Sequence, residues 1–514
     1  MILLILACSD QNSSESKPKE TAPAVQKSTQ RFPQHTAKGP LQKPSGRPLG
    51  RPPQHGNNQH HPPSGGHVSK SIKLEPNFSW SSDDLVSEQQ RSIVLISLDT
   101  VRADYLSVYG GSAQVPLVEG VAQRGVRFSQ AISHFPETAL SHWSMMSGML
   151  PQVHGNVPAN GGSVYKGPTL AELAKEQGYA TSAVIGGVTM TDQSSGFSRG
   201  FDSYDDQFSF SMEDMSRNGL EVSQKAANWI SKHQRSQEGT KNPQPYFLFA
   251  HYFDAHFPYT PSSKYEQQYA TGYSGTLDGS DAKLRPYRDG EKEPSAEEVK
   301  HIVGLYKAEI AELDAKLKPL LDVIDSETIV VITSDHGESF EHGYYFNHRA
   351  GLWDGVVHVP LIISAPHLPQ NIEISQQVGL MDLLPTVLDL AGLKKDDRFM
   401  GKSLLSLIQG ESEQGTDQVF SITDPWMPDP QFAVRTNLWK WISQEKGELV
   451  YDLKSDPLEL SSLSNPPKDL SDSKTIYAQL IASTEKDRQK TEKRIISEEE
   501  CARLEALGYT TCQH

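Results

Sequence analysis

The chain has 514 residues, of which 36% are hydrophobic and 22% charged, and its formal net charge is −16. Nucleic acid and anionic membrane surfaces repel a chain with this negative charge. We therefore expect neither of them as its main partner. The length allows one large α/β core or about two to four smaller domains.

Residues 1–8 and 9–84 differ in composition from the rest of the chain. Residues 1–8 read MILLILAC, and their end, Ile5 to Cys8, resembles the lipobox of bacterial lipoproteins. That resemblance implies a lipid on Cys8 that tethers the chain in the bacterial cell envelope, at the outer membrane or in the periplasm. A truncated signal peptide and a chance match are the alternatives. Residues 9–84 are rich in Pro, Gln, His and Ser and cannot bury enough apolar surface to fold, so we expect a disordered tether.

The cysteine pattern does not identify a functional site. If Cys8 carries a lipid, Cys501 and Cys512 are left to form one disulfide or to stay as two thiols. The sequence has no C-x-x-C pair and no zinc-finger spacing.

From residue 85 onward, several apolar runs are continuous, as in strands that are buried in a parallel sheet. A capping-box pair, Ser295 and Glu298, marks the start of a long helix. In chain order we expect a strand at Arg91–Asp99, helices at Val115–Arg127, Ala139–Met149 and Leu170–Gly178, strands at Ala180–Ile185 and Pro245–Phe253, a polar surface loop over 261–294, a helix from Ser295 to Leu321, and strands at Glu327–Ser334 and Val359–Ser364.

The last part of the chain predicts a smaller unit. Leu380–Leu393 reads as a core helix, and Phe432–Leu453 alternates as short strands around Gly447. We expect a small antiparallel sheet there, with a terminal helix at Ile495–Leu507 packed against it.

Three of the predicted strands end in acidic or imidazole side chains. Asp99 follows the first, Asp254 and His256 follow another, and Asp335 and His336 follow a third. Because the carboxyl ends of parallel strands meet at one edge of a sheet, we expect a metal-assisted anion site there. Two carboxylates that share one ion lie within about 8 Å, given ~2.0–2.6 Å metal–oxygen bonds. The alternative is that each Asp or His caps a strand end or forms a salt bridge.

Thr138 comes directly before the helical stretch Ala139–Met149, where a threonine side chain often caps a helix. The helix N-terminus offers free N–H groups and a partial positive charge, which suit a bound sulfate or phosphate. His142 lies four residues later, on the same face, so a hydroxyl and an imidazole are expected to meet over one anion. An ordinary cap beside a surface histidine is the alternative.

Motifs in a fixed order give the chain a family resemblance. They are LDTVRADYLSVYG from Leu98, GVRFSQAISHFPETALSHWSMMSGMLPQVHG from Gly125, GFSRGFDSYDD from Gly196, HYFDAHFPY from His251, TSDHGESFEHG from Thr333, HRAGLWDGVVHVPLIISAP from His348 and YDLKSDPLE from Tyr451. Through them the chain resembles the sulfatase family of the alkaline phosphatase superfamily. The resemblance implies an α/β catalytic domain over 85–400, with a large, mostly parallel central sheet flanked by helices. A smaller C-terminal α+β subdomain with a short antiparallel sheet is implied over 401–514.

The resemblance also implies the site. Sulfatases hydrolyse sulfate or phosphate esters with one divalent metal ion. Thr138 falls where they have the Cys or Ser that becomes formylglycine, and His142 replaces their usual Arg. The implied metal ligands are Asp99, Thr138, Asp335 and His336, and the implied catalytic residues are Thr138, His142, His256 and His348.

Three departures from the family pattern affect the expected chemistry. Threonine cannot become formylglycine, Thr100 stands where many sulfatases have a second metal-binding Asp, and a Lys-Trp-His motif is absent near Gly186–Thr189. The Thr138 hydroxyl would therefore need a metal ion to act as a nucleophile. A nitrogen ligand with only two acids favours Mn²⁺ or Zn²⁺ over Ca²⁺.

Three functions remain open from the sequence. The first is a lipid-tethered hydrolase of sulfate or phosphate esters, acting on a small molecule or a glycan. The second keeps the site but cleaves phosphodiesters or phosphonates, or transfers a phosphoethanolamine or phosphoglycerol group. The third is a binding lipoprotein that has lost turnover.

Overall fold

The computed structural model describes residues 90–155, 167–209, 216–349, 351–395, 398–412, 414–423 and 430–464, together with short pieces between 472 and 482. The predictions for residues 1–8 and 9–84, for Cys501 and Cys512, and for the helix Ile495–Leu507 lie outside these residues. No helix among the described residues combines the length and apolar character that a membrane crossing requires.

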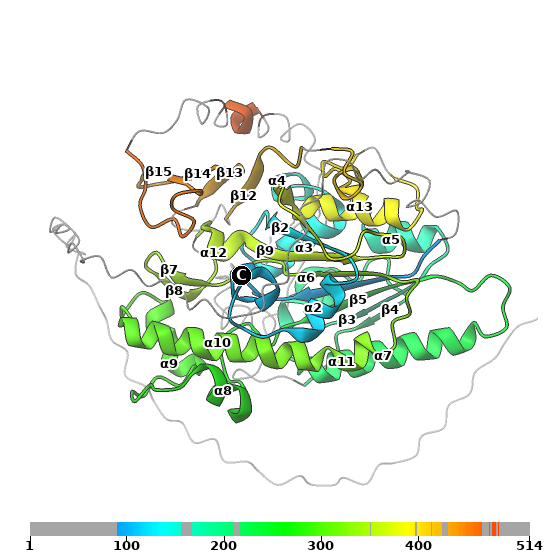
Figure 1. Ribbon diagram of the computed structural model, residues 1–514, viewed down its shortest axis with the longest axis horizontal. Coiled ribbons are helices and arrows are strands. Elements are labelled where there is room, and N and C mark those ends of the chain that lie inside the picture. Colours follow the sequence, from blue (N-terminus) through cyan, green and yellow to red (C-terminus); the bar gives the residue numbers. More distant parts are fainter. Residues whose placement is uncertain are drawn as a thin grey trace, which may run out of the picture. The chain divides into compact units, whose positions relative to one another are not determined.

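A large mixed sheet forms the centre of the molecule (Figure 1). Its hydrogen-bonded strand order is β10-β2-β9-β6-β1-β5-β3-β4, and β11 also pairs with β2. The strands are β1 (Ile93–Leu98), β2 (Val126–Ile132), β3 (Ala180–Val184), β4 (Ser203–Asp205), β5 (Tyr246–Tyr252), β6 (Ile329–Thr333), β9 (His358–Ser364), β10 (Ile372–Ile374) and β11 (Val378–Gly379). Strands β6, β1, β5, β3 and β4 are parallel, whereas β9 is antiparallel to both of its neighbours. The predicted α/β fold with a mostly parallel sheet is confirmed.

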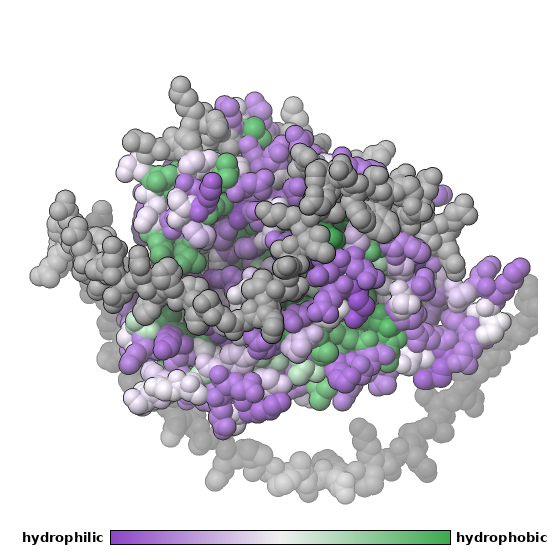
Figure 2. All heavy atoms as spheres, in the orientation of Figure 1, coloured by the Kyte–Doolittle hydropathy of each residue, from purple (hydrophilic) through white to green (hydrophobic). Residues whose placement is uncertain are grey.

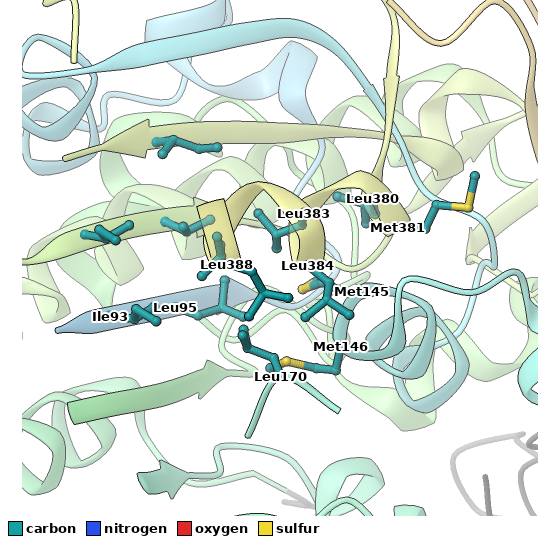
Figure 3. Close-up of a cluster of buried hydrophobic side chains, with 14 of the residues drawn as sticks. Ile93, Leu95, Met145, Met146, Leu170, Leu380, Met381, Leu383, Leu384 and Leu388 are labelled. Carbon is teal, nitrogen blue, oxygen red and sulfur yellow. The ribbon is translucent and has the colours of Figure 1, made fainter. Parts of the chain in front are cut away.

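Helices bury both faces of this sheet, as the continuous apolar strands require. On one face, Ile93 and Leu95 of β1 pack with α3 (Thr138–Ser147), α5 (Leu170–Glu176) and α13 (Leu383–Leu390) (Figure 3). On the other face, Val94 and Ile96 pack with α2 (Pro116–Ala122), α7 (Gly219–Ser236) and α10 (Ala296–Lys316). Each buried Leu, Ile or Met side chain contributes about 1.5–3 kcal/mol, so the strands that carry the site are held firmly.

The predicted capping box begins its helix, and a second capping box that was not predicted begins another. Ser295 and Glu298 start α10, and Thr169 and Glu172 start α5 in the same way. The long predicted helix is divided, because α10 ends at Lys316 and a short α11 follows over Lys318–Leu321.

The prediction of a polar surface loop over 261–294 was wrong. The segment 261–294 contains α8 (Ser263–Tyr269) and α9 (Asp281–Arg288), short helices that tertiary contacts stabilise; Leu284 of α9, for example, is fully buried. The segment after Asp335 forms the hairpin β7 (Ser339–Glu341) and β8 (Tyr344–Asn347), with His342 in its turn. Neither element has the length or the periodicity that sequence patterns detect.

The predicted C-terminal sheet is present as four antiparallel strands. They run in the order β12 (Val419–Ile422), β13 (Phe432–Arg435), β14 (Trp439–Gln444) and β15 (Gly447–Asp452). Gly447, the first residue of β15, has a φ of 128°, which only glycine adopts readily. The sheet joins the core through hydrogen bonds such as Ser421 Oγ to the Ser133 carbonyl, 2.6 Å.

The visible surface is mainly polar. On the face seen in Figure 2, hydrophilic side chains predominate and hydrophobic ones form separate areas.

Candidate active site

The carboxyl ends of β1 and β6 bring three predicted ligands together. Asp99 follows β1, and Asp335 and His336 follow the adjacent parallel strand β6. One ligand atom from each lies within 4.8 Å of the others, and all three residues are fully buried. His336 Nε2 is 3.3 Å from Asp335 Oδ2 and 4.0 Å from Asp99 Oδ1. The carboxylates are therefore as close as one shared ion requires.

The chemistry of this group fits a divalent cation. Among the described residues, Asp99 Oδ1, Asp335 Oδ2 and His336 Nε2 are buried without hydrogen-bond partners. Burial and the nearby Asp335 raise the pKa of Asp99 well above its usual value. Two buried carboxylates in contact are unfavourable unless a positive charge lies between them. Two oxygens and one imidazole nitrogen are the donor set that such an ion would meet.

Thr138 lies next to this group, but the prediction that it caps its helix was wrong. Glu137, in extended conformation, is the N-cap residue, and Thr138 is the first residue of α3. The Glu137 carbonyl accepts the first turn's hydrogen bond from Ser141, 3.1 Å. The Thr138 side chain instead interacts with Asp99 and opposes the rise in the pKa of that carboxyl. Its hydroxyl therefore belongs to the buried site.

His142 lies beneath the site rather than on the surface. Its Nδ1 is 2.7 Å from the Thr138 carbonyl oxygen, and its Nε2 is 2.8 Å from Ser97 Oγ. Burial lowers the pKa of the imidazole to about 4, so the ring is neutral at pH 7. The ring thus faces the carbonyl of Thr138, not its hydroxyl, and lies 3.7 Å from Asp335 Oδ2.

The other two predicted histidines lie close to the predicted metal ligands. His348 follows β8, and its ring centroid is 4.3 Å from that of His336 and 5.2 Å from that of His256. His256 follows β5, stacks on Phe253 and places Nδ1 2.7 Å from the Phe257 carbonyl oxygen. The structure therefore brings the rings of His256, His336 and His348 together in one cluster.

Two residues near the predicted strand ends have other roles. Asp254 accepts hydrogen bonds from the Gly219 backbone N–H, 3.0 Å, and from Lys316 Nζ, 2.8 Å. His342, in the turn of the β7–β8 hairpin, stacks on Trp353 with ring centroids 4.5 Å apart. Asp254 thus forms a salt bridge, which is the alternative interpretation of the residues at strand ends.

Sequence reasoning missed several residues that touch the site. His251, inside β5, places Nε2 3.0 Å from Asp99 Oδ2, and the buried Glu338 contacts His348. Glu137 forms an ion pair with Arg349. The only signal for His251 is a polar residue inside an apolar strand, next in the sheet to the strand that ends at Asp99.

Two protein-family models match the chain. A family model described as "Sulfatase" matches residues 91–393, and a second, "N-sulphoglucosamine sulphohydrolase, C-terminal", matches residues 340–489. Arylsulfatase K of Homo sapiens is 32% identical over 187 residues, which are 32% of this chain and 34% of that protein. Arylsulfatase K of Gallus gallus is 30% identical over 187 residues, covering 33% and 34%. The matched segments thus span about a third of these relatives.

Solved structures share the fold. A 2-O GAG sulfatase has a TM-score of 0.61 at 22% identity, with 80% of this chain and 96% of that chain covered. The phosphonate monoester hydrolase of Agrobacterium radiobacter has a TM-score of 0.58 at 20% identity, covering 78% and 96%. At these identities the likeness concerns the fold alone.

Proposed function

Because the chain belongs to the sulfatase family, a family of sulfuric ester hydrolases, we propose that it is a metal-dependent hydrolase of sulfate esters with Thr138 as its nucleophile. The observation that carries this proposal is the buried group of Asp99, Asp335 and His336 with the Thr138 side chain beside it. No other arrangement among the described residues offers three such donors within bonding distance of one ion.

The metal ion would be held by Asp99, Asp335, His336 and the Thr138 oxygen. When bound, such an ion lowers the pKa of a coordinated hydroxyl and stabilises negative charge on the ester oxygens. Mn²⁺ and Zn²⁺ suit the mixed oxygen and nitrogen donors better than Ca²⁺ does.

Different residues carry out the successive steps of the reaction. The Thr138 oxygen bonds to sulfur as the bond from sulfur to the alcohol oxygen breaks, and the hydroxyl proton leaves to water. A histidine, His256 or His348, gives a proton to the departing alcohol. Water then attacks the sulfated Thr138 and releases sulfate, which restores the hydroxyl. His142 holds the first turn of α3 through the Thr138 carbonyl.

The substrate class is proposed from what two structural neighbours act on or bind. One structural neighbour is a GAG sulfatase, and another was solved with D-glucosamine-2-N,6-O-disulfate, so we propose a sulfated glycan or a small sulfate ester. A second candidate is hydrolysis of a phosphonate or phosphate ester, which is favoured by the likeness to a phosphonate monoester hydrolase. The lipid on Cys8 and a place in the bacterial cell envelope belong to the same proposal. Mass spectrometry of the N-terminal peptide tests them.

Metal analysis and ester turnover test the proposed function. We expect about one bound ion per chain and release of nitrophenol from its sulfate ester, with smaller rates on a phosphate diester and a phosphonate ester. Thr138→Ala should remove turnover, while Ser280→Ala, at a helix start outside the site, should leave it unchanged. Metal binding without turnover of any ester would support the binding lipoprotein instead.

A further inference from the structure

Each of the three predicted metal ligands uses one polar atom for a contact with the protein and leaves another for an ion. Asp99 places Oδ2 3.0 Å from His251 Nε2. Asp335 Oδ1 accepts a hydrogen bond from the Thr100 backbone N–H, 3.3 Å. His336 places Nδ1 2.9 Å from the carbonyl oxygen of the next residue. The atoms left without a hydrogen-bond partner among the described residues are Asp99 Oδ1, Asp335 Oδ2 and His336 Nε2. An ion would therefore meet one oxygen of each carboxylate.

The second oxygen of Asp335 is occupied by a turn in an unfavourable conformation. Thr100, directly after Asp99, has a φ of 59°, a left-handed value that β-branched residues rarely adopt. Such a conformation persists only where the surrounding structure holds it. In this conformation the Thr100 backbone N–H points at Asp335 Oδ1. The contacts that hold the turn therefore decide whether this oxygen stays occupied.

Two buried hydroxyl groups hold the Thr100 turn. Tyr306 of α10 donates its hydroxyl hydrogen to the Thr100 carbonyl, 2.6 Å, and accepts the Arg102 backbone N–H, 2.9 Å. Ser334, directly after β6, accepts the Val101 backbone N–H, 3.0 Å, and donates to the backbone carbonyl two residues further on, 2.6 Å. Both side chains are fully buried. Loss of either hydroxyl would therefore leave buried backbone groups without a partner.

We propose that Tyr306 is a positioning residue that sets the ion preference of the site. By holding the Thr100 turn, it limits Asp335 to one free oxygen and so favours Zn²⁺ over Ca²⁺. This inference rests on the metal site of the proposed function and deepens it. Zn²⁺ takes about four single donors, imidazole nitrogen among them. Ca²⁺ takes about six to eight oxygens, often both oxygens of one carboxylate. Two single oxygens, one nitrogen and the Thr138 oxygen match the first ion.

Removal of the Tyr306 hydroxyl separates ion selectivity from structural support. Without this hydroxyl the Thr100 carbonyl loses its partner, the turn relaxes, and its N–H moves away from Asp335 Oδ1. The Asp335 carboxylate can then turn both oxygens toward an ion. This change offsets the looser geometry for Ca²⁺ but not for Zn²⁺. A residue that only supports the fold would weaken the binding of both ions by the same factor.

The experiment measures the dissociation constants of Zn²⁺ and of Ca²⁺, each added alone to the metal-free full-length chain, by competition with a chelating dye. We expect the wild type to bind Zn²⁺ at least about 100-fold more tightly than Ca²⁺. Tyr306→Phe should weaken Zn²⁺ binding about 10–100-fold and Ca²⁺ binding less than about threefold. Ser334→Ala should lower the ratio of the two affinities in the same direction.

Tyr179→Phe is the matched control. The buried Tyr179 hydroxyl donates to the Arg91 carbonyl, 2.7 Å, just before β1 begins. The variant thus loses the same kind of hydrogen bond at the opposite end of the strand, and both dissociation constants should stay unchanged. Asp335→Asn removes a ligand and gives the background from histidines elsewhere in the chain, which is subtracted.

Other outcomes overturn the inference. If Tyr306→Phe weakens both ions equally or leaves the ratio unchanged, Tyr306 has a structural role only. A wild type that binds Ca²⁺ as tightly as Zn²⁺ shows that the occupied oxygens do not set the ion preference. If Tyr306→Phe does not fold by circular dichroism, Ser334→Ala decides, because it releases the same turn from its other side. Zn²⁺ binding without ester turnover removes the proposed hydrolysis alone, whereas binding of neither ion removes the metal site and this inference with it.

Discussion

At the scale of single residues, the geometry of the candidate site depends on neighbours that contact the predicted metal ligands. His251 and Asp99 are both fully buried, and their contact of 3.0 Å crosses from β5 to the end of β1. This contact fixes one carboxylate oxygen of Asp99 and leaves Oδ1 directed at the ligand group. Such second partners keep a ligand oriented before the ion arrives.

His251→Phe tests this role through metal binding alone. The variant keeps an aromatic ring in β5 but loses the contact with Asp99, so we expect Mn²⁺ to bind about 10–100-fold more weakly by titration calorimetry. His233→Phe, on the exposed side of α7, is the control with unchanged binding. Equal affinity in the His251 variant and the wild type would contradict the assigned role.

Glu309 gives the molecule a pH dependence away from the site. Burial and the nearby Asp254 raise the pKa of this carboxyl from 4.5 to about 8. The folded state therefore keeps a proton that the unfolded state loses above pH 4.5. The free energy of unfolding falls as pH rises from about 4.5 to 8, by at most about 1.4 kcal/mol per pH unit, and this contribution is constant above pH 8.

Glu309→Gln should remove that slope. Gln stays neutral, so the variant should gain stability relative to the wild type between pH 5 and pH 8, measured by urea unfolding at several pH values. Glu297→Gln, in the first turn of the same helix, is the exposed control. A constant difference across the pH range would show that Glu309 is ionised throughout.

At the scale of elements, an ion pair links the helix that carries Thr138 to the hairpin that carries His348. Glu137, directly before α3, pairs with Arg349, directly after His348. Their side chains are 2% and 13% exposed, so solvent screens the pair little. The pair thus couples the positions of Thr138 and His348.

Breaking this pair should separate catalysis from metal binding. We expect Glu137→Gln to lower kcat and to cost about 3 kcal/mol of unfolding free energy, because Arg349 keeps a poorly solvated charge. Mn²⁺ affinity should stay unchanged, since neither residue is a ligand. The double variant Glu137→Gln, Arg349→Gln should recover part of the stability but not kcat. If it recovers kcat as well, the pair does not position the two groups.

The sequence predicts long or strongly patterned elements better than short ones. Continuous apolar runs identify the central strands, and the acids that end β1 and β6 indicate the ligand group because neighbouring parallel strands share an edge. The short α8, α9 and β7–β8 hairpin escape detection, since tertiary packing stabilises them. Glu338 and His251 were missed because their roles depend on contacts between distant segments, which no local pattern records.

At the scale of the whole molecule, a buried charge network joins the C-terminal sheet to the catalytic core. Asp354 pairs with Arg435 of β13 and Lys440 of β14, each at 2.8 Å, and Lys440 also meets Glu459 at 3.0 Å. The Lys440 side chain is 0% exposed. Buried ion pairs thus attach the C-terminal sheet to the core, and each buried charge is stable only while it is paired.

Asp354→Asn should reveal how strongly this attachment contributes to stability. Because Arg435 and Lys440 would lose a buried partner, we expect the free energy of unfolding to fall by about 3–5 kcal/mol in urea. Lys446→Gln, exposed in the β14–β15 turn, should change it by less than about 0.5 kcal/mol. A small effect of Asp354→Asn would mean that hydrogen bonds such as that of Ser421 hold the sheet without the charges.

The register between β1 and β6 has one more consequence. Since hydrogen bonding along these buried strands sets how far apart their last residues lie, we expect Asp99 and Asp335 to stay close together with or without an ion. The empty protein must then tolerate mutual repulsion that a cation would relieve. Removal of the ion by a chelator should therefore leave the circular dichroism spectrum unchanged but lower the melting temperature. The fold does not need the ion, whereas repulsion between the two carboxylates destabilises the metal-free protein.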